Sequence, residues 1–387
     1  MVSKLRPNTT RRQLFSMAAI VALVMAGLQI VGGDRALASH VSCGATITTD
    51  TMLDSDLVNC SNNGIVIGAD NITLDLNGHT IDGDGEPFAS CPENEFCDIG
   101  VLNDGHDGIT VMNGSIGEFA VGAFVGRARH NRVLGISSSR NVFFGFVVTE
   151  SARSLVRDSS GSGNLRPDGD GMGVFGSHDI RVLQSSFRHN PLGMHIEDSA
   201  DNLIKENDIS GNSGPGLLIQ ADNNEVRRNM CARNKSACII VSSGDRNLIA
   251  RNHGFRDGGG IGIEEGKRNL VTRNEIVRPR KTGISLGFRP QFGGGHNVVR
   301  RNEVRGTGFD GFLVTQKDDH SVLGRNVAKG AGDDGFDIES ASATLTRNLA
   351  IRNDDLGIAA VRGVIDGGGN IARHNRDPRQ CTAILCR

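Results

Sequence analysis

The chain has 387 residues, with 42 Lys and Arg against 44 Asp and Glu, and it contains neither Trp nor Tyr. Without the first 38 residues, which carry five basic residues and one acidic residue, 37 basic and 43 acidic residues remain, a net charge of −6 that argues against a nucleic-acid partner. Sites for neutral glycans commonly stack such aromatic rings on sugar faces, so their absence disfavours an enzyme of neutral glycans, and the 16 Phe are expected mostly in the core.

The amino-terminal segment, residues 1–38, has the features of an export signal. Arg11 and Arg12 precede an apolar run at residues 14–31, and Ala36-Leu37-Ala38 matches a small-x-small cleavage site. The adjacent arginines resemble a twin-arginine signal, and a general secretory signal or an uncleaved anchor are the alternatives. We expect an exported chain, extracellular, periplasmic or at the cell envelope, whose mature part does not span a membrane.

A column of glycines recurs through the rest of the chain, mostly at steps of 22 or 23 residues, and a column of asparagines runs in phase with it. Cys238 takes the place of a glycine midway between Gly216 and Gly260. Repetition at such a period is typical of stacked-repeat proteins. The glycines are Gly100, Gly122, Gly145, Gly171, Gly193, Gly216, Gly260, Gly283, Gly311, Gly335 and Gly357, and the asparagines are Asn207, Asn229, Asn252, Asn274, Asn302, Asn326, Asn348 and Asn375.

Each repeat contains two short stretches of alternating apolar and polar residues bounded by Gly, Asn, Ser and Asp, and no window has a helical period of useful length. We therefore predict an all-β solenoid, a parallel β-helix of roughly a dozen rungs over residues 39–387. Asparagines on adjacent rungs are expected to chain their amide hydrogen bonds, and the column glycines to accommodate positive φ. Two apolar columns are expected inside: Ile204, Val226, Ile249, Val271, Val299, Leu323 and Leu345, and Met194, Leu217, Ile239, Ile261, Ile284, Phe312, Phe336 and Ile358.

The repeated Asn-x-apolar-x-x-Asn-x-apolar unit resembles the right-handed parallel β-helix repeat of the pectate-lyase-like superfamily. The opening segments 43–51, 57–60 and 72–81 are similar to the start of secreted bacterial members, many of which are grouped with NosD-like β-helix proteins. The resemblance covers residues 43–387 and implies a single-stranded right-handed parallel β-helix. It implies no single reaction, because the superfamily includes lyases, hydrolases, epimerases and proteins without catalytic activity.

The eight cysteines fall as four close pairs: Cys43/Cys60, Cys91/Cys97, Cys231/Cys238 and Cys381/Cys386. Such spacings suit local disulfides in an oxidising compartment, whereas the paired CxxC or Cys/His clusters of a zinc site are missing. The first and last pairs lie at the ends of the predicted coil, so we expect disulfide-bearing caps at residues 39–63 and 376–387. Cys231 and Cys238 fall on inward or turn positions, where reduced core residues are the alternative.

Arginine occupies the position before the column asparagine on six consecutive rungs, bracketed by Glu206 and His374. At the strand spacing of 4.7–4.9 Å, the six span roughly 24 Å of one outer edge. One interpretation is a binding track for an extended polyanion such as a polyuronate, and the other is a solvated face whose arginines pair with neighbours such as Glu275 and Glu303. The six are Arg228, Arg251, Arg273, Arg301, Arg325 and Arg347, with Arg227 and Arg300 beside them.

Candidate catalytic groups gather around residues 166–197. His195 and Glu197 lie two residues apart on one predicted strand face, and one rung earlier Asp168 and Asp170 lie on a turn about four residues longer than its neighbours. Carboxylates with a histidine suit general acid–base work on a glycan. Asp also precedes the column glycine on two later rungs, so a turn role for Asp170 is the competing interpretation.

Other features are less specific. The acidic groups at Asp318-Asp319-His320 and Asp333-Asp334 are candidates for active-site loops or for Ca²⁺ ligands, and the histidines are too scattered to favour a copper site. Insertions that break the repeat at residues 82–98, 166–170 and 288–295 are candidate binding loops, and the first of them contains Cys91 and Cys97.

These features favour a secreted protein, expected to be monomeric, that engages an extended acidic polysaccharide or a cell-envelope glycan as a lyase, epimerase or hydrolase. The catalytic elements typical of polygalacturonases and mannuronan epimerases are missing from the sequence. The alternative is therefore a non-catalytic, NosD-like binding or scaffold protein of the cell envelope.

Overall fold

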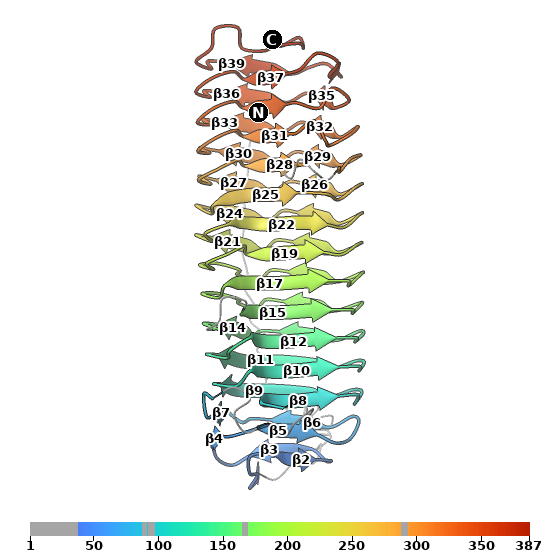
Figure 1. Cartoon of the computed structure of the whole chain (residues 1–387), viewed down its shortest axis with the longest axis vertical. Coiled ribbons are helices and arrows are strands. Elements are labelled where there is room, and N and C mark those ends of the chain that lie inside the picture. The colour runs from blue at the N-terminus through green and yellow to red at the C-terminus, as the bar shows by residue number, and fades with distance from the viewer. Residues whose placement is uncertain (1–37, 87–90, 92–96, 165–168, 288–292) are drawn as a thin grey trace, which may run out of the picture. The chain divides into compact units, whose positions relative to one another are not determined.

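The structure, a computed structural model, describes residues 38–86, 91, 97–164, 169–287 and 293–387. Apart from Ala38, the expected export signal lies outside the described residues, as do parts of the three expected insertions. Within the described residues the regular elements are all strands, and they form sheets of 14, 18 and 7 members in which the paired strands are parallel. Successive turns of the coil stack on one another (Figure 1).

The 14-stranded sheet contributes one strand to each turn. Its members are β2 (Ala45–Ile47), β5 (Ile65–Ile67), β8 (Ile99–Asp104), β10 (Val121–Gly126), β12 (Phe144–Thr149), β15 (Asp170–Phe175), β17 (Leu192–Glu197), β19 (Leu217–Gln220), β22 (Ala237–Ser243), β25 (Gly259–Ile263), β28 (Ile284–Leu286), β31 (Phe312–Val314), β34 (Phe336–Ile338) and β37 (Ile358–Ala360).

The other two sheets close the coil. The 18-stranded sheet contains β1 (Ala38–Ser39), β3 (Thr51–Leu53), β4 (Leu57–Cys60), β6 (Thr73–Asp75), β7 (Thr80–Gly83), β9 (Thr110–Gly117), β11 (Arg132–Ser139), β13 (Leu155–Arg157), β14 (Ser160–Ser162), β16 (Arg181–Leu183), β18 (Leu203–Lys205), β20 (Glu225–Arg227), β23 (Leu248–Ala250), β26 (Leu270–Thr272), β29 (Val298–Arg300), β32 (Val322–Gly324), β35 (Thr344–Thr346) and β38 (Ile365–Asp366). The 7-stranded sheet contains β21 (Met230–Ala232), β24 (His253–Phe255), β27 (Glu275–Val277), β30 (Glu303–Arg305), β33 (Val327–Lys329), β36 (Leu349–Ile351) and β39 (Ile371–Arg373).

The core consists of the two predicted apolar columns. Ile204, Val226 and Ile249 are register partners on successive turns, as are Leu217, Ile239 and Ile261. These side chains are at most 1% exposed, and the rings of Phe312 and Phe336 stack with centroids 4.6 Å apart. The prediction of a parallel β-helix is confirmed. The 14-stranded sheet, with one strand from each turn, gives 14 turns against the dozen rungs expected.

The expectation that the column glycines accommodate positive φ is wrong. None of these glycines has a left-handed φ; instead, each lies where the coil leaves no room for a side chain. A Cβ on Gly311 would lie 2.5 Å from the carbonyl oxygen of Gly335, the glycine of the next turn, and one on Gly100 would lie 2.5 Å from that of Gly122. The column therefore preserves close spacing between turns rather than backbone freedom.

Buried asparagine ladders run along the corners of the coil. The Oδ1 atom of Asn229 accepts hydrogen bonds from the backbone and side-chain nitrogens of Asn207, each at 3.0 Å, and the pattern repeats from turn to turn. This confirms the predicted ladder with one correction at its end. Asn348 bonds to Asn370, whereas Asn375 continues a different ladder from Asn353.

Four disulfides join the cysteine pairs that the spacing predicted, with Cα–Cα distances between 5.3 and 6.3 Å. Cys231 and Cys238 are also oxidised, so the alternative of reduced core residues at this pair is wrong. In the part of the chain that the structure describes, no helix has the length and apolarity to cross a membrane.

The disulfide between Cys91 and Cys97 joins the insertion to the point where the chain rejoins the coil. Residues 82–98 were expected to form a candidate binding loop, but Cys97 is only 4% exposed. Its Sγ atom lies 3.3 Å from Oδ1 of Asn62, because Cys97 sits two residues before β8, where the chain rejoins the stacked turns. Cys97 therefore anchors the end of the insertion to the coil, and the expectation of a binding loop concerns residues that lie mostly outside the described part of the chain.

Candidate functional site

The outward face of the 14-stranded sheet carries the candidate site. Along each strand the residues two and four positions after the column glycine point away from the core, and parallel register aligns them from turn to turn. At the amino-terminal end this face is apolar, with three rings among its residues. The patch comprises Ile99, Leu102, Val121, Phe124, Phe144, Val147 and Phe175. The expectation that Phe lies mostly in the core missed these three rings.

His195 lies beside this apolar patch and between two carboxylates. Its Nδ1 atom is 3.7 Å from Oδ2 of Asp170, whose side chain is 6% exposed. Its Nε2 atom is 3.9 Å from Oε2 of Glu197, which is about half exposed. The structure thus brings Asp170, His195 and Glu197 together, whereas Asp168 lies outside the described residues. Its place before a glycine suggested a turn role for Asp170, but its side chain also lies against His195.

The surroundings of His195 favour its charged form. Burial of the ring opposes protonation, but the polar contacts to Asp170 and Gln220 and the negative charges of Asp170 and Glu197 outweigh it, so the pKa of His195 lies above the ordinary value of 6.5. The ring also meets Phe175 edge-on, with centroids 5.4 Å apart. Gly173 makes this packing feasible, because a Cβ there would lie 2.3 Å from the Phe175 ring.

Gln220, which sequence reasoning missed, connects this cluster to a hollow. Its Oε1 atom lies 2.9 Å from Nε2 of His195, and the same residue lines a hollow of about 830 Å³ on the next turns of the sheet. The hollow exists because Gly259 and Gly262 are the outward residues of β25, flanked by Leu218 and Ile240 on earlier turns. Its volume falls within the range of ligand-binding clefts.

Polar groups of both signs line the hollow. Glu264, at 7% exposure, is its most buried carboxylate, and Lys235 and Lys281 are exposed cations beside it. A buried carboxyl group with cations nearby is an arrangement that suits proton transfer. Alternation predicts the outward position of Gln220, because Gln220 and Glu197 each lie four residues after a column glycine. The sequence has no signal that singles out Glu264.

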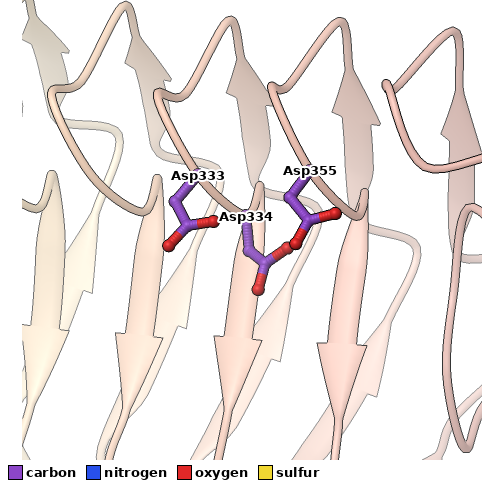
Figure 2. Close-up of side chains that lie close together, drawn as sticks. All are labelled: Asp333, Asp334 and Asp355. Carbon is purple, nitrogen blue, oxygen red and sulfur yellow. The ribbon is translucent and has the colours of Figure 1, made fainter.

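An acidic cluster follows at the carboxyl-terminal end of the same face. Asp333, Asp334 and Asp355 place carboxylate oxygens within 4.8 Å of one another, the only such group of three or more potential metal ligands among the described residues (Figure 2). Burial and neighbouring carboxylates raise the pKa of Asp334 to about 6 and that of Asp337 to about 7. Oxygen atoms of this kind are hard-cation ligands, so these residues are the ones that could hold Ca²⁺.

The other acidic group, Asp318-Asp319-His320, differs from this cluster. Asp318 is fully buried, and its Oδ2 atom accepts a hydrogen bond of 3.0 Å from the ladder residue Asn297. Burial is the main cause that raises its pKa to about 6. This carboxyl therefore supports a corner of the coil.

The arginine column lies on another side of the coil. Arg228 falls between β20 and β21, the junction of the 18- and 7-stranded sheets, and the other five occupy the same junction on later turns. The structure therefore does not bring the arginines together with His195. His374 does not bracket the column, because the residue before the ladder asparagine Asn370 is Gly369.

In the alternative interpretation of the arginines as a solvated face, the pairing with Glu275 and Glu303 is wrong, whereas the exposure of the face is as expected. Glu303 pairs with Arg305 at 2.6 Å, and Glu275 lies 3.5 Å from His253 and 3.7 Å from Arg305. All six arginines are exposed. Within the described residues, an acidic partner within 4.0 Å is found for Arg228 alone among the six, namely Glu206 at 3.3 Å.

Comparisons with known proteins agree with this architecture. The family model of the right-handed β-helix region matches residues 170–291. Among solved structures, the chain is similar to a tailspike protein mutant of E. coli bacteriophage HK620, with 14% identity, a TM-score of 0.56 and coverage of 84% of this chain and 68% of that one. It is also similar to the Streptococcus pneumoniae surface protein and adhesin PfbA, with 12% identity, a TM-score of 0.51 and coverage of 79% and 90%.

A third similar structure is the A-module of the Azotobacter vinelandii mannuronan C-5 epimerase AlgE4, with 14% identity, a TM-score of 0.49 and coverage of 78% of this chain and 80% of that one. No protein of curated function matches the chain. At these identities the structural likeness concerns the fold alone. The chain therefore folds as a parallel β-helix, of which residues 170–291 match the family model of the right-handed β-helix region.

Proposed function

We propose that the protein is exported and binds an extended acidic polysaccharide along the outward face of the 14-stranded sheet, where the Asp170–His195–Glu197 cluster transfers protons. The observation that carries this proposal is the position of His195, which Gln220 links to an open hollow of about 830 Å³. A β-helix aligns equivalent positions about every 4.8 Å, so successive turns present subsites to a linear polymer. The four disulfides support export, because such bonds persist in oxidising compartments.

The roles follow from the geometry. His195, whose pKa is raised by its neighbours, is the candidate acid that protonates a leaving glycosidic oxygen. Glu197, more exposed and 3.9 Å away, is the candidate base, while Asp170 orients the imidazole. Lys235 and Lys281 supply the positive charge that a uronate carboxylate requires when the proton at the adjacent carbon is removed. In a lyase the C4–O bond then breaks, and in an epimerase a proton returns on the opposite face.

A panel of polyuronates and neutral glycans, incubated with the purified mature protein with and without Ca²⁺, tests the proposal. A rise in ultraviolet absorbance from unsaturated ends indicates a lyase, new reducing ends a hydrolase, and altered uronate NMR signals an epimerase. His195→Ala and Glu197→Gln should each lower turnover about 100-fold or more, the usual effect of removing a general acid or base. His178→Ala is the matched control, since His178 pairs with Asp179 at 3.1 Å outside the hollow.

The non-catalytic alternative predicts a different pattern. A scaffold or binding protein would retain the glycan through the hollow without turnover, and His195→Ala would then change affinity only. If none of the glycans binds, or if turnover survives in both His195→Ala and Glu197→Gln, the proposed site is wrong. Peptide mass mapping without reductant tests export separately, because free thiols at Cys43–Cys60 and Cys381–Cys386 in the mature protein would contradict it.

A further inference from the structure

A second hollow, of about 320 Å³, lies among the arginines on the side of the coil away from His195. Its shape results from the outward column of the 18-stranded sheet. Arg227 and Arg300 stand three turns apart in that column, and the two turns between them carry the short side chains of Ala250 and Thr272. The hollow thus has a low floor and an arginine at each end. Its wall consists of Arg228, Arg251, Arg273 and Arg301.

Most of this positive charge has no carboxylate within salt-bridge distance among the residues that the structure describes. The acidic residue of the hollow, Glu225, pairs with Arg227 at 3.0 Å. Glu206 pairs with Arg228 at the edge. Across the described residues, no carboxylate lies within 4.0 Å of Arg251, Arg273 or Arg301. Like charges on adjacent strands are destabilising, so an external anion would stabilise this arrangement.

Backbone geometry does not account for the arginines. Each of the four wall residues has a φ of +55° to +57°, a left-handed conformation that Gly and Asn adopt more readily than Arg. On earlier turns the same position holds Asp158, Gln184 and Glu206, so the backbone there accepts other residue types. The basic segment begins abruptly at Arg228. Its guanidinium groups repeat at the strand spacing of about 4.8 Å.

We infer that this arginine groove, defined by Arg227, Arg228, Arg251, Arg273, Arg300 and Arg301, is a binding site for an anionic polysaccharide, separate from the hollow beside His195. Guanidinium groups pair well with carboxylate and sulfate oxygens, and their regular repeat matches a polymer with one anionic group per sugar. A single-stranded nucleic acid fits less well, because no aromatic side chain lines the groove to stack on bases. The groove would hold the polymer whether or not the other face turns it over.

Binding of fluorescent polygalacturonate to the full mature chain tests this inference. The variant carries Arg228→Asn, Arg251→Asn and Arg273→Asn, since Asn tolerates the left-handed backbone. We expect Kd to rise at least about tenfold, the combined effect of three exposed ion pairs, and binding of the parent chain to weaken as salt is added. Binding should survive Gly262→Leu, which fills the other hollow.

The matched control carries Arg233→Asn, Arg256→Asn and Arg278→Asn. These three arginines lie on the same turns, are equally exposed and have φ of +53° to +59°, but they do not line the groove. The control should bind within about twofold of the parent chain. Equal loss in both triple variants would reduce the effect to net charge and overturn the inference. So would equally tight, groove-dependent binding of poly(dT), or binding of neutral dextran as tight as that of polygalacturonate.

Discussion

The Nε2 atom of His195 lies 2.9 Å from Oε1 of Gln220, its neighbour on the next turn, and Gln220 is the residue that also lines the large hollow. An amide oxygen accepts hydrogen bonds, so Nε2 carries a proton. On the other side of the ring Nδ1 faces a carboxylate oxygen of Asp170. Both nitrogens thus face acceptors, an arrangement that suits the imidazolium form at the end of a ligand-sized space.

The first prediction concerns the titration of His195. Asp170→Asn should lower its pKa, because the charge and polar contact of Asp170 help raise it. In the parent chain the stabilisation from this charge is fully present below the unfolded pKa of about 6.5 and is lost as the pH rises through the raised folded value. NMR titration of the imidazole measures the pKa of His195 in the parent chain and in Asp170→Asn, with the other histidines as internal controls. An unchanged pKa in Asp170→Asn would contradict the role of Asp170.

The second prediction concerns the large hollow. Gly262 has no left-handed φ, and a Cβ there would meet only the Oγ atom of Ser285 at 3.5 Å, an ordinary contact. Gly262→Leu should therefore fold normally, fill the hollow and weaken glycan binding to this face at least about tenfold. Gly262→Ala should leave binding nearly unchanged. Calorimetric titration of chains that also carry the three Asn substitutions in the arginine groove isolates this face, and equal affinity of the Leu and Ala variants would contradict the proposed site.

The third prediction concerns space between turns. In Gly311→Ala the new Cβ would lie 2.5 Å from the carbonyl oxygen of Gly335 and 2.8 Å from Cβ of Ala328. We expect the free energy of unfolding to fall by about 1–3 kcal/mol, the usual effect of overpacking. Gly262→Ala makes the same substitution at a glycine with room for a methyl group, and its free energy of unfolding should stay within about 0.5 kcal/mol of that of the parent chain. Denaturant unfolding compares them, and equal stabilities would show that the turns can separate to admit a methyl group.

The fourth prediction concerns the asparagine ladder. Oδ1 of Asn274 accepts hydrogen bonds from the backbone and side-chain nitrogens of Asn252, at 2.9 and 3.1 Å. Asn274→Ala leaves these buried donors without an acceptor, so unfolding should become easier by about 3 kcal/mol. Arg273→Asn changes the exposed neighbour and should have an effect within about 0.5 kcal/mol. Thermal and denaturant unfolding measure the difference, and a small loss in Asn274→Ala would mean that the ladder contributes little.

The fifth prediction concerns the acidic end of the sheet. Burial and nearby carboxylates raise the pKa of Asp337 to about 7. The stabilisation from its protonated form is fully present below the unfolded pKa of about 4 and is lost as the pH rises through 7. Asp337→Asn should therefore raise the melting temperature most at pH 8 and least near pH 4. A shift of equal size at both pH values would contradict the raised pKa.

Much of the coil could be predicted from local pattern. The steps between column glycines predicted the turns, and two-residue alternation placed His195 and Glu197 on the same outward face, as the structure has them. The cysteine spacings predicted the four disulfides, although they did not show that Cys97 is buried against the coil. The predicted features depend on residues close in the chain or on the repeat itself, so the sequence contains the information directly.

The sequence by itself determined the repeat, the two inward apolar columns and the outward positions of His195 and Glu197. Only the tertiary structure decided which side of the coil each column occupies, because that depends on where each turn bends between its sheets. It separated the arginines from His195 and paired Glu275 and Glu303 with other cations. It also joined Gln220 to His195 and formed a hollow over Gly259 and Gly262, since such contacts join residues about one turn apart and depend on the register between turns.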